Sequence, residues 1–290
     1  MKLVFLIFIL ILLITIQFSF IRSPVQLRYV YDCGNSNDKL TNDRFGIPPK
    51  TICLTIKDKK YIPQYIFDQF EKYANGYIIK IFDDNECREF LRKEYNEDYV
   101  KRFDNIKEGA HKADLFRYAY LFKKGGFYMD IKTILLKDLD DILREIPTNF
   151  IMIKSSNGQA YDIINDNGSI YNGIIYTYPG NVYIKALLID AMYGPPIEAY
   201  DRFIKSAHEI LKTFTLDTYV NYGYIKTDDS ISDVYILQED FFNINHCDKL
   251  DRRNTCSFIV HANTGEKVFK TRDSNYLPNY VNMSEKKITN

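Results

Sequence analysis

The chain has 290 residues, of which 46% are hydrophobic and 26% charged, and its 38 Lys and Arg residues balance its 38 Asp and Glu residues. This composition excludes a collagenous or disordered chain, and zero net charge argues against nucleic-acid binding, which requires a basic surface. Residues 1–22 contain Lys2 and Arg22 and no acid, so 36 basic and 38 acidic residues follow, a net charge of −2.

Residues 3–21 predict a membrane-spanning helix. Leu, Ile, Val and Phe fill this stretch except at Thr15, Gln17 and Ser19. A helix of that length covers roughly 28 Å, close to the hydrocarbon thickness of a bilayer. A cleaved signal peptide is the alternative, but residues 19–22 lack a convincing small-x-small cleavage site. We therefore expect an uncleaved signal anchor at residues 1–22.

A polar stem at residues 23–46 separates the anchor from a folded domain. From residue 47 the pattern predicts a strand at 51–56, a helix at 63–73, a strand at 77–82 and a helix that Asp84 caps and that runs to about residue 95. Such alternation is typical of an α/β domain with a mostly parallel sheet, in which ligands bind beyond the carboxyl ends of the strands. We expect this domain at residues 47–275, followed by a polar tail at 276–290.

The next predicted element is a helix over residues 112–124, which ends in two lysines and is stopped by Gly125 and Gly126. Asp114 and Arg117 are three residues apart and share one face of it. The ordinary interpretation is an exposed ion pair that contributes about 0.2–0.5 kcal/mol.

Residues 127–131 predict a strand directly after the glycines, where alternate residues point the same way. Tyr128, Asp130 and Lys132 would then share a face. Charged residues in an apolar strand are costly unless they stand at its exposed end or reach a ligand. Carboxylates and guanidinium groups suit the hydroxyls of a ligand, and aromatic faces suit bases or sugar rings.

These residues form two runs, Ala-Asp-x-x-Arg-Tyr at 113–118 and Gly-Gly-x-Tyr-x-Asp at 125–130. The runs resemble the sugar-binding region of glycosyltransferase family 32, which carries an Asp-x-Asp motif and includes yeast-type initiating α-1,6-mannosyltransferases and capsular sugar transferases. The similarity covers residues 47 to about 185, including residues 171–181.

The resemblance implies a GT-A fold and a membrane-anchored type II enzyme with its catalytic domain in a Golgi- or ER-like lumen. The enzyme would transfer a hexose from a nucleotide-sugar donor, UDP- or GDP-hexose, to a glycan or glycolipid acceptor with retention of anomeric configuration.

By matching position, Asp114, Arg117 and Asn172 would bind the donor sugar. Tyr128 would help to form the nucleotide pocket. Asp130 would be the first aspartate of the motif, near the ribose and the metal-bound diphosphate.

Lys132 departs from the family pattern, because relatives place a second metal-binding aspartate there. A charged lysine cannot bind a cation. Three interpretations follow. Transfer is metal-independent, with Lys132 beside the leaving diphosphate; or Asp130 holds Mn²⁺ or Mg²⁺ together with acids such as Asp138 or Asp140 and with His261; or the domain binds glycans or nucleotide sugars without catalysis.

Overall fold

The computed structural model describes residues 45–62, 64–146, 148–155, 169–195, 202–216, 219–240, 256–260, 263–264 and 266–272. All of them lie in one compact unit, Leu40–Asn290. The predicted anchor, nearly all of the stem, His261 and the polar tail lie outside the described residues. Among the helices that are described, none has the length and apolar character needed to cross a bilayer.

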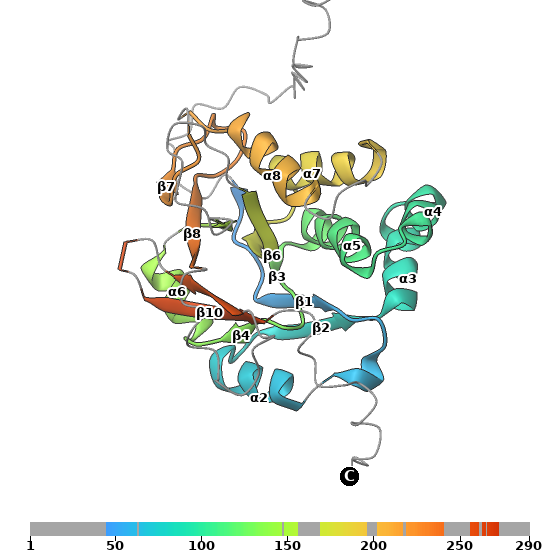
Figure 1. The fold of residues 1–290 in the computed structure, drawn as a ribbon, viewed down its shortest axis with the longest axis horizontal. Helices are drawn as coiled ribbons and strands as arrows, with labels where there is room; N and C mark the ends of the chain where they lie inside the picture. The colour runs from blue at the N-terminus through green and yellow to red at the C-terminus, as the bar shows by residue number, and fades with distance from the viewer. Residues whose placement is uncertain are drawn as a thin grey trace, which may run out of the picture. The chain divides into compact units, whose positions relative to one another are not determined.

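A mixed sheet of ten strands runs through the unit in the order β2-β1-β3-β6-β5-β8-β9-β10-β4, with β7 paired to β8 (Figure 1). Strands β1, β2 and β3 are mutually parallel, and β5 is parallel to β8; the other described pairs are antiparallel. The α/β class is confirmed, with parallel pairing where strands alternate with helices. The strands are β1 (Thr51–Thr55), β2 (Ile78–Phe82), β3 (Gly126–Met129), β4 (Ile134–Leu135), β5 (Phe150–Ser155), β6 (Ser169–Thr177), β7 (Gly223–Ile225), β8 (Val234–Asp240), β9 (Cys256–Val260) and β10 (Lys267–Arg272).

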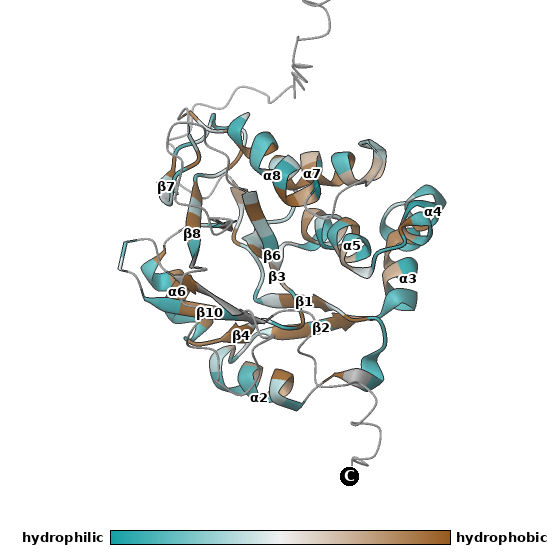
Figure 2. Ribbon diagram, viewed as in Figure 1, coloured by the Kyte–Doolittle hydropathy of each residue, from teal (hydrophilic) through white to brown (hydrophobic). Residues whose placement is uncertain are grey.

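Helices cover both faces of this sheet and form two hydrophobic cores. One face packs against α3 (Asp84–Glu94), α4 (Glu97–Asn105), α5 (Gly109–Lys124), α7 (Val182–Tyr193) and α8 (Arg202–Lys212). The other packs against α2 (Gln64–Tyr73) and α6 (Leu139–Glu145). Figure 2 shows the brown, hydrophobic residues on β1 and β2 and the teal residues on the outer helix α4.

Two helix predictions differ slightly from the structure. The cap of α3 is Asp83, whose side chain accepts hydrogen bonds from the backbone N–H groups of Asn85 and Glu86, while Asp84 is the first helical residue. Helix α5 begins at Gly109, three residues before its predicted start, and ends at Lys124 as predicted.

A tight hairpin joins α5 to β3. Gly125 and Gly126 have φ angles of 64° and 88°, in the region that favours glycine. A Cβ on Gly126 would lie 2.6 Å from the Thr51 carbonyl oxygen, so the missing side chain lets β3 begin directly against β1. The predicted consequence, that the helix and the strand bring their polar residues together, follows from this turn.

The strand after the hairpin is shorter than predicted. β3 ends at Met129, and Thr133 N–H donates to the Asp130 carbonyl at 2.8 Å, which closes a turn over residues 130–133. The buried side chain of Gln69 on α2 holds this turn, since Nε2 donates to the Thr133 carbonyl and Oε1 accepts from Leu135 N–H, both at 2.9 Å. Lys132 therefore lies on the turn, and the prediction that it shares a strand face with Tyr128 and Asp130 is wrong.

Candidate functional site

The candidate site lies at the edge of the sheet where the parallel strands end. Thr55 ends β1, and Asp130 directly follows β3. Asn172 comes from β6, which runs antiparallel to β3 and so begins at the same edge. The hairpin brings Asp114 and Arg117 of α5 to this edge as well. Ligands of open α/β sheets bind at such carboxyl edges.

Arg117 is the centre of the site. Its Nη2 lies 3.3 Å from Asp114 Oδ1 and 3.3 Å from Asp130 Oδ1. Its Nη1 donates to the Asn172 carbonyl at 2.5 Å and to Asn172 Oδ1 at 3.0 Å. Arg117 is only 3% exposed and Asp114 only 6%. The pair is therefore a buried network, and the alternative of an exposed ion pair is wrong.

Asn172 joins β6 to α5 within this network. Its Nδ2 donates to Asp114 Oδ1 and to the Tyr118 hydroxyl, each at 2.8 Å. An irregularity in β6 shapes this segment, because Ile151 pairs with Tyr176 but Ile153 pairs with Tyr171, which leaves residues 172–175 opposite Met152 alone. Bulges of this kind re-aim side chains beside functional sites.

Asp130 is the member of the network that reaches solvent, with 22% of its side chain exposed. The Tyr128 hydroxyl donates to Asp130 Oδ1 at 3.1 Å and lies 3.0 Å from Thr55 Oγ1. Tyr128 is fully buried, and the Arg117 guanidinium lies 4.4 Å from its ring centre. Arg117 thus covers one face of the Tyr128 ring, and the Tyr128 hydroxyl supports Asp130.

The buried charges of the site influence one another. Burial raises the pKa of Asp114, although Arg117 favours its charged form. Burial alone would lower the pKa of Arg117, but Tyr128, Asp114 and Asp130 raise it overall, so the guanidinium stays charged. Burial also raises the pKa of Tyr128, which keeps the phenol neutral. Two carboxyl groups thus share one guanidinium, a balance that suits ligand hydroxyls better than ligand phosphates.

Lys132 lies apart from this network, on the turn after Asp130. The side chain makes no hydrogen bond or ion pair with any residue in the described part of the chain. In the sequence Lys132 is two residues from Asp130.

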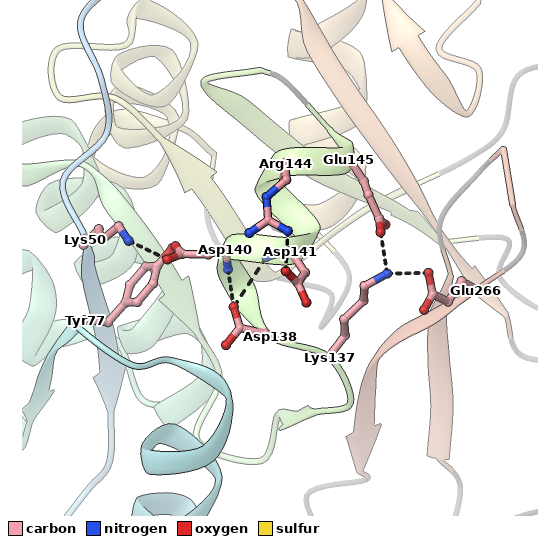
Figure 3. Close-up of polar contacts among 9 residues, drawn as sticks. All are labelled: Lys50, Tyr77, Lys137, Asp138, Asp140, Asp141, Arg144, Glu145 and Glu266. Atoms are coloured by element: carbon pink, nitrogen blue, oxygen red, sulfur yellow. Dashed lines mark hydrogen bonds and ion pairs between the residues drawn. The ribbon is translucent and has the colours of Figure 1, made fainter.

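The acids proposed to complete a metal site with Asp130 are engaged elsewhere (Figure 3). Asp138 caps α6, and Asp140 binds Lys50 Nζ at 2.5 Å and the Tyr77 hydroxyl at 2.9 Å. Lys50 and Tyr77 precede β1 and β2, so this cluster lies at the amino edge of the sheet, opposite Asp130. The described ranges contain no group of three His, Cys, Asp or Glu side chains suited to a metal, and His261 lies outside them. Within the described residues, Asp138 and Asp140 therefore do not join Asp130 in a metal site.

Three residues of the site had not been singled out from the sequence: Thr55, Tyr118 and Gly173. Thr55 and Tyr118 are hydrogen-bond partners of predicted residues; Tyr118 ends the Ala-Asp-x-x-Arg-Tyr run, whereas nothing local marks Thr55. Gly173 did carry a signal, since glycine inside a strand often marks a close approach. A Cβ there would lie 2.7 Å from Asp130 Oδ2 and closer still to the Tyr171 hydroxyl.

Comparison with known proteins points to one family. Residues 59–148 match the family described as "Glycosyltransferase sugar-binding region containing DXD motif". The match spans Asp114, Arg117, Tyr128, Asp130 and Lys132 and ends before Asn172.

Curated relatives agree with this match. The chain is 35% identical over 72 residues to an uncharacterized glycosyltransferase of Acanthamoeba polyphaga mimivirus, covering 25% of this chain and 29% of the relative. It is 32% identical over 101 residues to the initiation-specific alpha-1,6-mannosyltransferase of Candida albicans, covering 32% and 26%. It is 32% identical over 111 residues to glucan organizing enzyme 1 of Cryptococcus neoformans, covering 38% and 28%. The aligned parts thus span less than a third of each relative. A solved structure titled "PaToxG Glycosyltransferase" superposes with a TM-score of 0.38 at 15% identity, over 57% of this chain and 74% of that one.

Proposed function

We propose that this chain, whose residues 59–148 match the glycosyltransferase family with a DXD-containing sugar-binding region, transfers a hexose from a nucleotide-sugar donor to a glycan or glycolipid acceptor. The observation that carries the proposal is the buried Asp114–Arg117–Asn172 network, which meets solvent at Asp130. Such a network presents fixed acceptors to the hydroxyls of a sugar or ribose.

The remaining features of the proposal come from the family resemblance and from residues 1–46. The donor is a UDP- or GDP-hexose in a GT-A-type site, and transfer retains the anomeric configuration. The chain is a type II membrane protein held by residues 3–21, with its catalytic domain in a Golgi- or ER-like lumen. The apolar run of residues 3–21 supports the anchor.

We further propose that transfer needs no divalent ion, because Lys132 stands where relatives place the second metal-binding aspartate. One ammonium beside the leaving diphosphate can offset part of its charge. Turnover of the full chain should persist in excess EDTA, and Lys132→Ala should lower kcat at least about tenfold. If turnover were lost in EDTA and recovered on adding Mn²⁺, a metal ion and not Lys132 would offset the charge of the leaving diphosphate. Unchanged turnover in Lys132→Ala would show that the lysine takes no part in the mechanism.

A thermal-shift panel of UDP- and GDP-sugars on the full chain, with and without Mn²⁺, tests the proposed function. A ligand that binds only the folded state stabilises it and so raises the melting temperature. When the ligand concentration is about one hundred times the dissociation constant, the added stability is about 2.7 kcal/mol. At least one nucleotide sugar should raise it. Stabilisation by none of them would contradict the proposal.

Asp114→Asn is the matched binding-site variant for this panel. We expect it to be at least as stable as the wild type at neutral pH but to bind the stabilising sugar at least about tenfold more weakly. Burial raises the pKa of Asp114 above its value in the unfolded chain, so the native state binds the carboxyl proton more tightly than the unfolded state does. The free energy of unfolding therefore falls as the pH rises from the unfolded pKa to the native pKa. The wild type should therefore gain stability relative to Asp114→Asn on acidification. The control is Asp141→Asn, at an exposed ion pair with Arg144.

A non-catalytic binding protein is the second candidate, and the replacement of the motif's second acid by Lys132 favours it. Such a protein would give the same thermal shifts but would neither hydrolyse nor transfer the donor sugar, even in the presence of candidate acceptors. Release of free UDP or GDP in the same samples separates the two functions.

A further inference from the structure

Tyr171, in β6, has a buried hydroxyl with no hydrogen-bond partner in the described structure. An unpaired buried hydroxyl destabilises the folded protein, and phenylalanine would fill the same space without that penalty. Buried polar groups are nearly always paired in native proteins, so an exception calls for an explanation.

The surroundings of this hydroxyl are shaped by Gly173. Were Gly173 to carry a Cβ, that atom would overlap the Tyr171 hydroxyl and lie 2.7 Å from Asp130 Oδ2. The phenol oxygen and the carboxylate oxygen thus both face the space that the missing side chain leaves open. Asp130 N–H also donates to the Gly173 carbonyl at 2.7 Å, which ties the two backbones together.

The two oxygens of Asp130 are held unequally. Oδ1 accepts from the Tyr128 hydroxyl and lies 3.3 Å from Arg117 Nη2. No described residue donates to Oδ2. The Tyr171 hydroxyl, which has no acceptor, and Asp130 Oδ2, which has no donor, therefore both lie beside Gly173 in the described structure.

From this arrangement we propose that Tyr171 is a positioning residue that acts through Asp130. When a nucleotide sugar engages Asp130, a small rotation of the carboxylate brings Oδ2 to the Tyr171 hydroxyl, and the new hydrogen bond fixes Asp130 in its ligand-bound orientation. The inference rests on the proposed function, since it names how the donor-binding carboxylate is held. The bond forms on binding, so its free energy contributes to affinity and not to the stability of the free protein.

Tyr171→Phe in the full chain tests this role, with UDP-glucose and GDP-mannose as probes. Its melting temperature without ligand should equal or exceed that of the wild type, because no bond is lost. Its affinity for the probe that binds the wild type should fall about tenfold or more, as expected for a lost hydrogen bond to a charged group. Tyr120→Phe is the control, since Tyr120 is the other tyrosine of the described chain with a buried, unpartnered hydroxyl and it packs among Phe82 and Phe90.

A double-mutant cycle with Asp130→Asn separates positioning from a general structural effect. If Tyr171 acts through Asp130, adding Tyr171→Phe to Asp130→Asn should weaken binding little further. Equal binding by Tyr171→Phe and the wild type would overturn the inference and leave the proposed function intact, as would full additivity of the two losses. A wild type that binds neither probe nor any other sugar of the panel would overturn the proposed function, and this inference with it.

Discussion

Replacing Arg117 with methionine should lower the free energy of unfolding by about 3–5 kcal/mol, because it leaves Asp114 buried without its counter-ion and Asp130 without a charged partner. Methionine keeps most of the buried stem, so the loss reports the guanidinium and not a cavity. For a folded unit of this size the melting temperature should fall by about 10 °C. Urea denaturation followed by circular dichroism measures the first quantity, and a thermal scan the second.

The matched control for this variant is Arg144→Met. Arg144 also pairs with an aspartate three residues before it, Asp141, at 2.7 Å, but 74% of its side chain is exposed. An exposed pair of this kind contributes about 0–1 kcal/mol. Equal losses in the two variants would show that burial of the Arg117 network contributes nothing to stability.

Gly126→Ala should destabilise the chain by about 3 kcal/mol or more and disrupt ligand binding. The new methyl group would enter a backbone conformation with φ at 88° and would press on the Thr51 carbonyl of β1. The hairpin that aligns α5 with β3 would have to shift, and the distance from Arg117 to Asp130 would change with it. A thermal scan together with the nucleotide-sugar panel measures both effects.

Gly180→Ala separates the two costs of Gly126→Ala, the backbone cost of a positive φ and the steric cost of the contact with Thr51. Gly180 has nearly the same φ, 80°, but nothing lies within 4 Å of the position a Cβ would take. Only the backbone cost of about 1–2 kcal/mol should remain there. If Gly126→Ala were no worse than Gly180→Ala, close packing of β3 on β1 would not matter for the fold.

The parts of the site that could be predicted from sequence are those encoded by near neighbours. The glycine pair at 125–126 marks the end of α5 and the start of β3, and the spacing of Asp114 and Arg117 fixes their common helix face. Both signals lie within a few residues of the feature they predict. The helix, the hairpin and the meeting of Asp114, Arg117 and Asp130 follow from them.

The features that sequence did not predict depend on distant residues. β3 ends at Met129 because Gln69, 64 residues before Thr133, holds the following turn. The irregularity at residues 172–175 depends on how β5 pairs with β6. The antiparallel half of the sheet likewise depends on pairings such as β8 with β9 that no local pattern specifies.

The turn that carries Asp130 and Lys132 leads at once into β4, whose strand partner in the described sheet is β10, more than a hundred residues later. In Figure 1 the green β4 lies against the red β10 accordingly. During synthesis on the ribosome, the α5–β3 hairpin and its parallel neighbours β1 and β2 can pair long before the end of the chain emerges. The turn acquires its final support only when residues near Lys270 are available, since that pairing closes a long loop. We therefore expect a nascent chain that still lacks β10 to have formed α5, with Asp114 and Arg117 in place. We expect it to bind a ligand at Asp130 only after β10 has paired with β4.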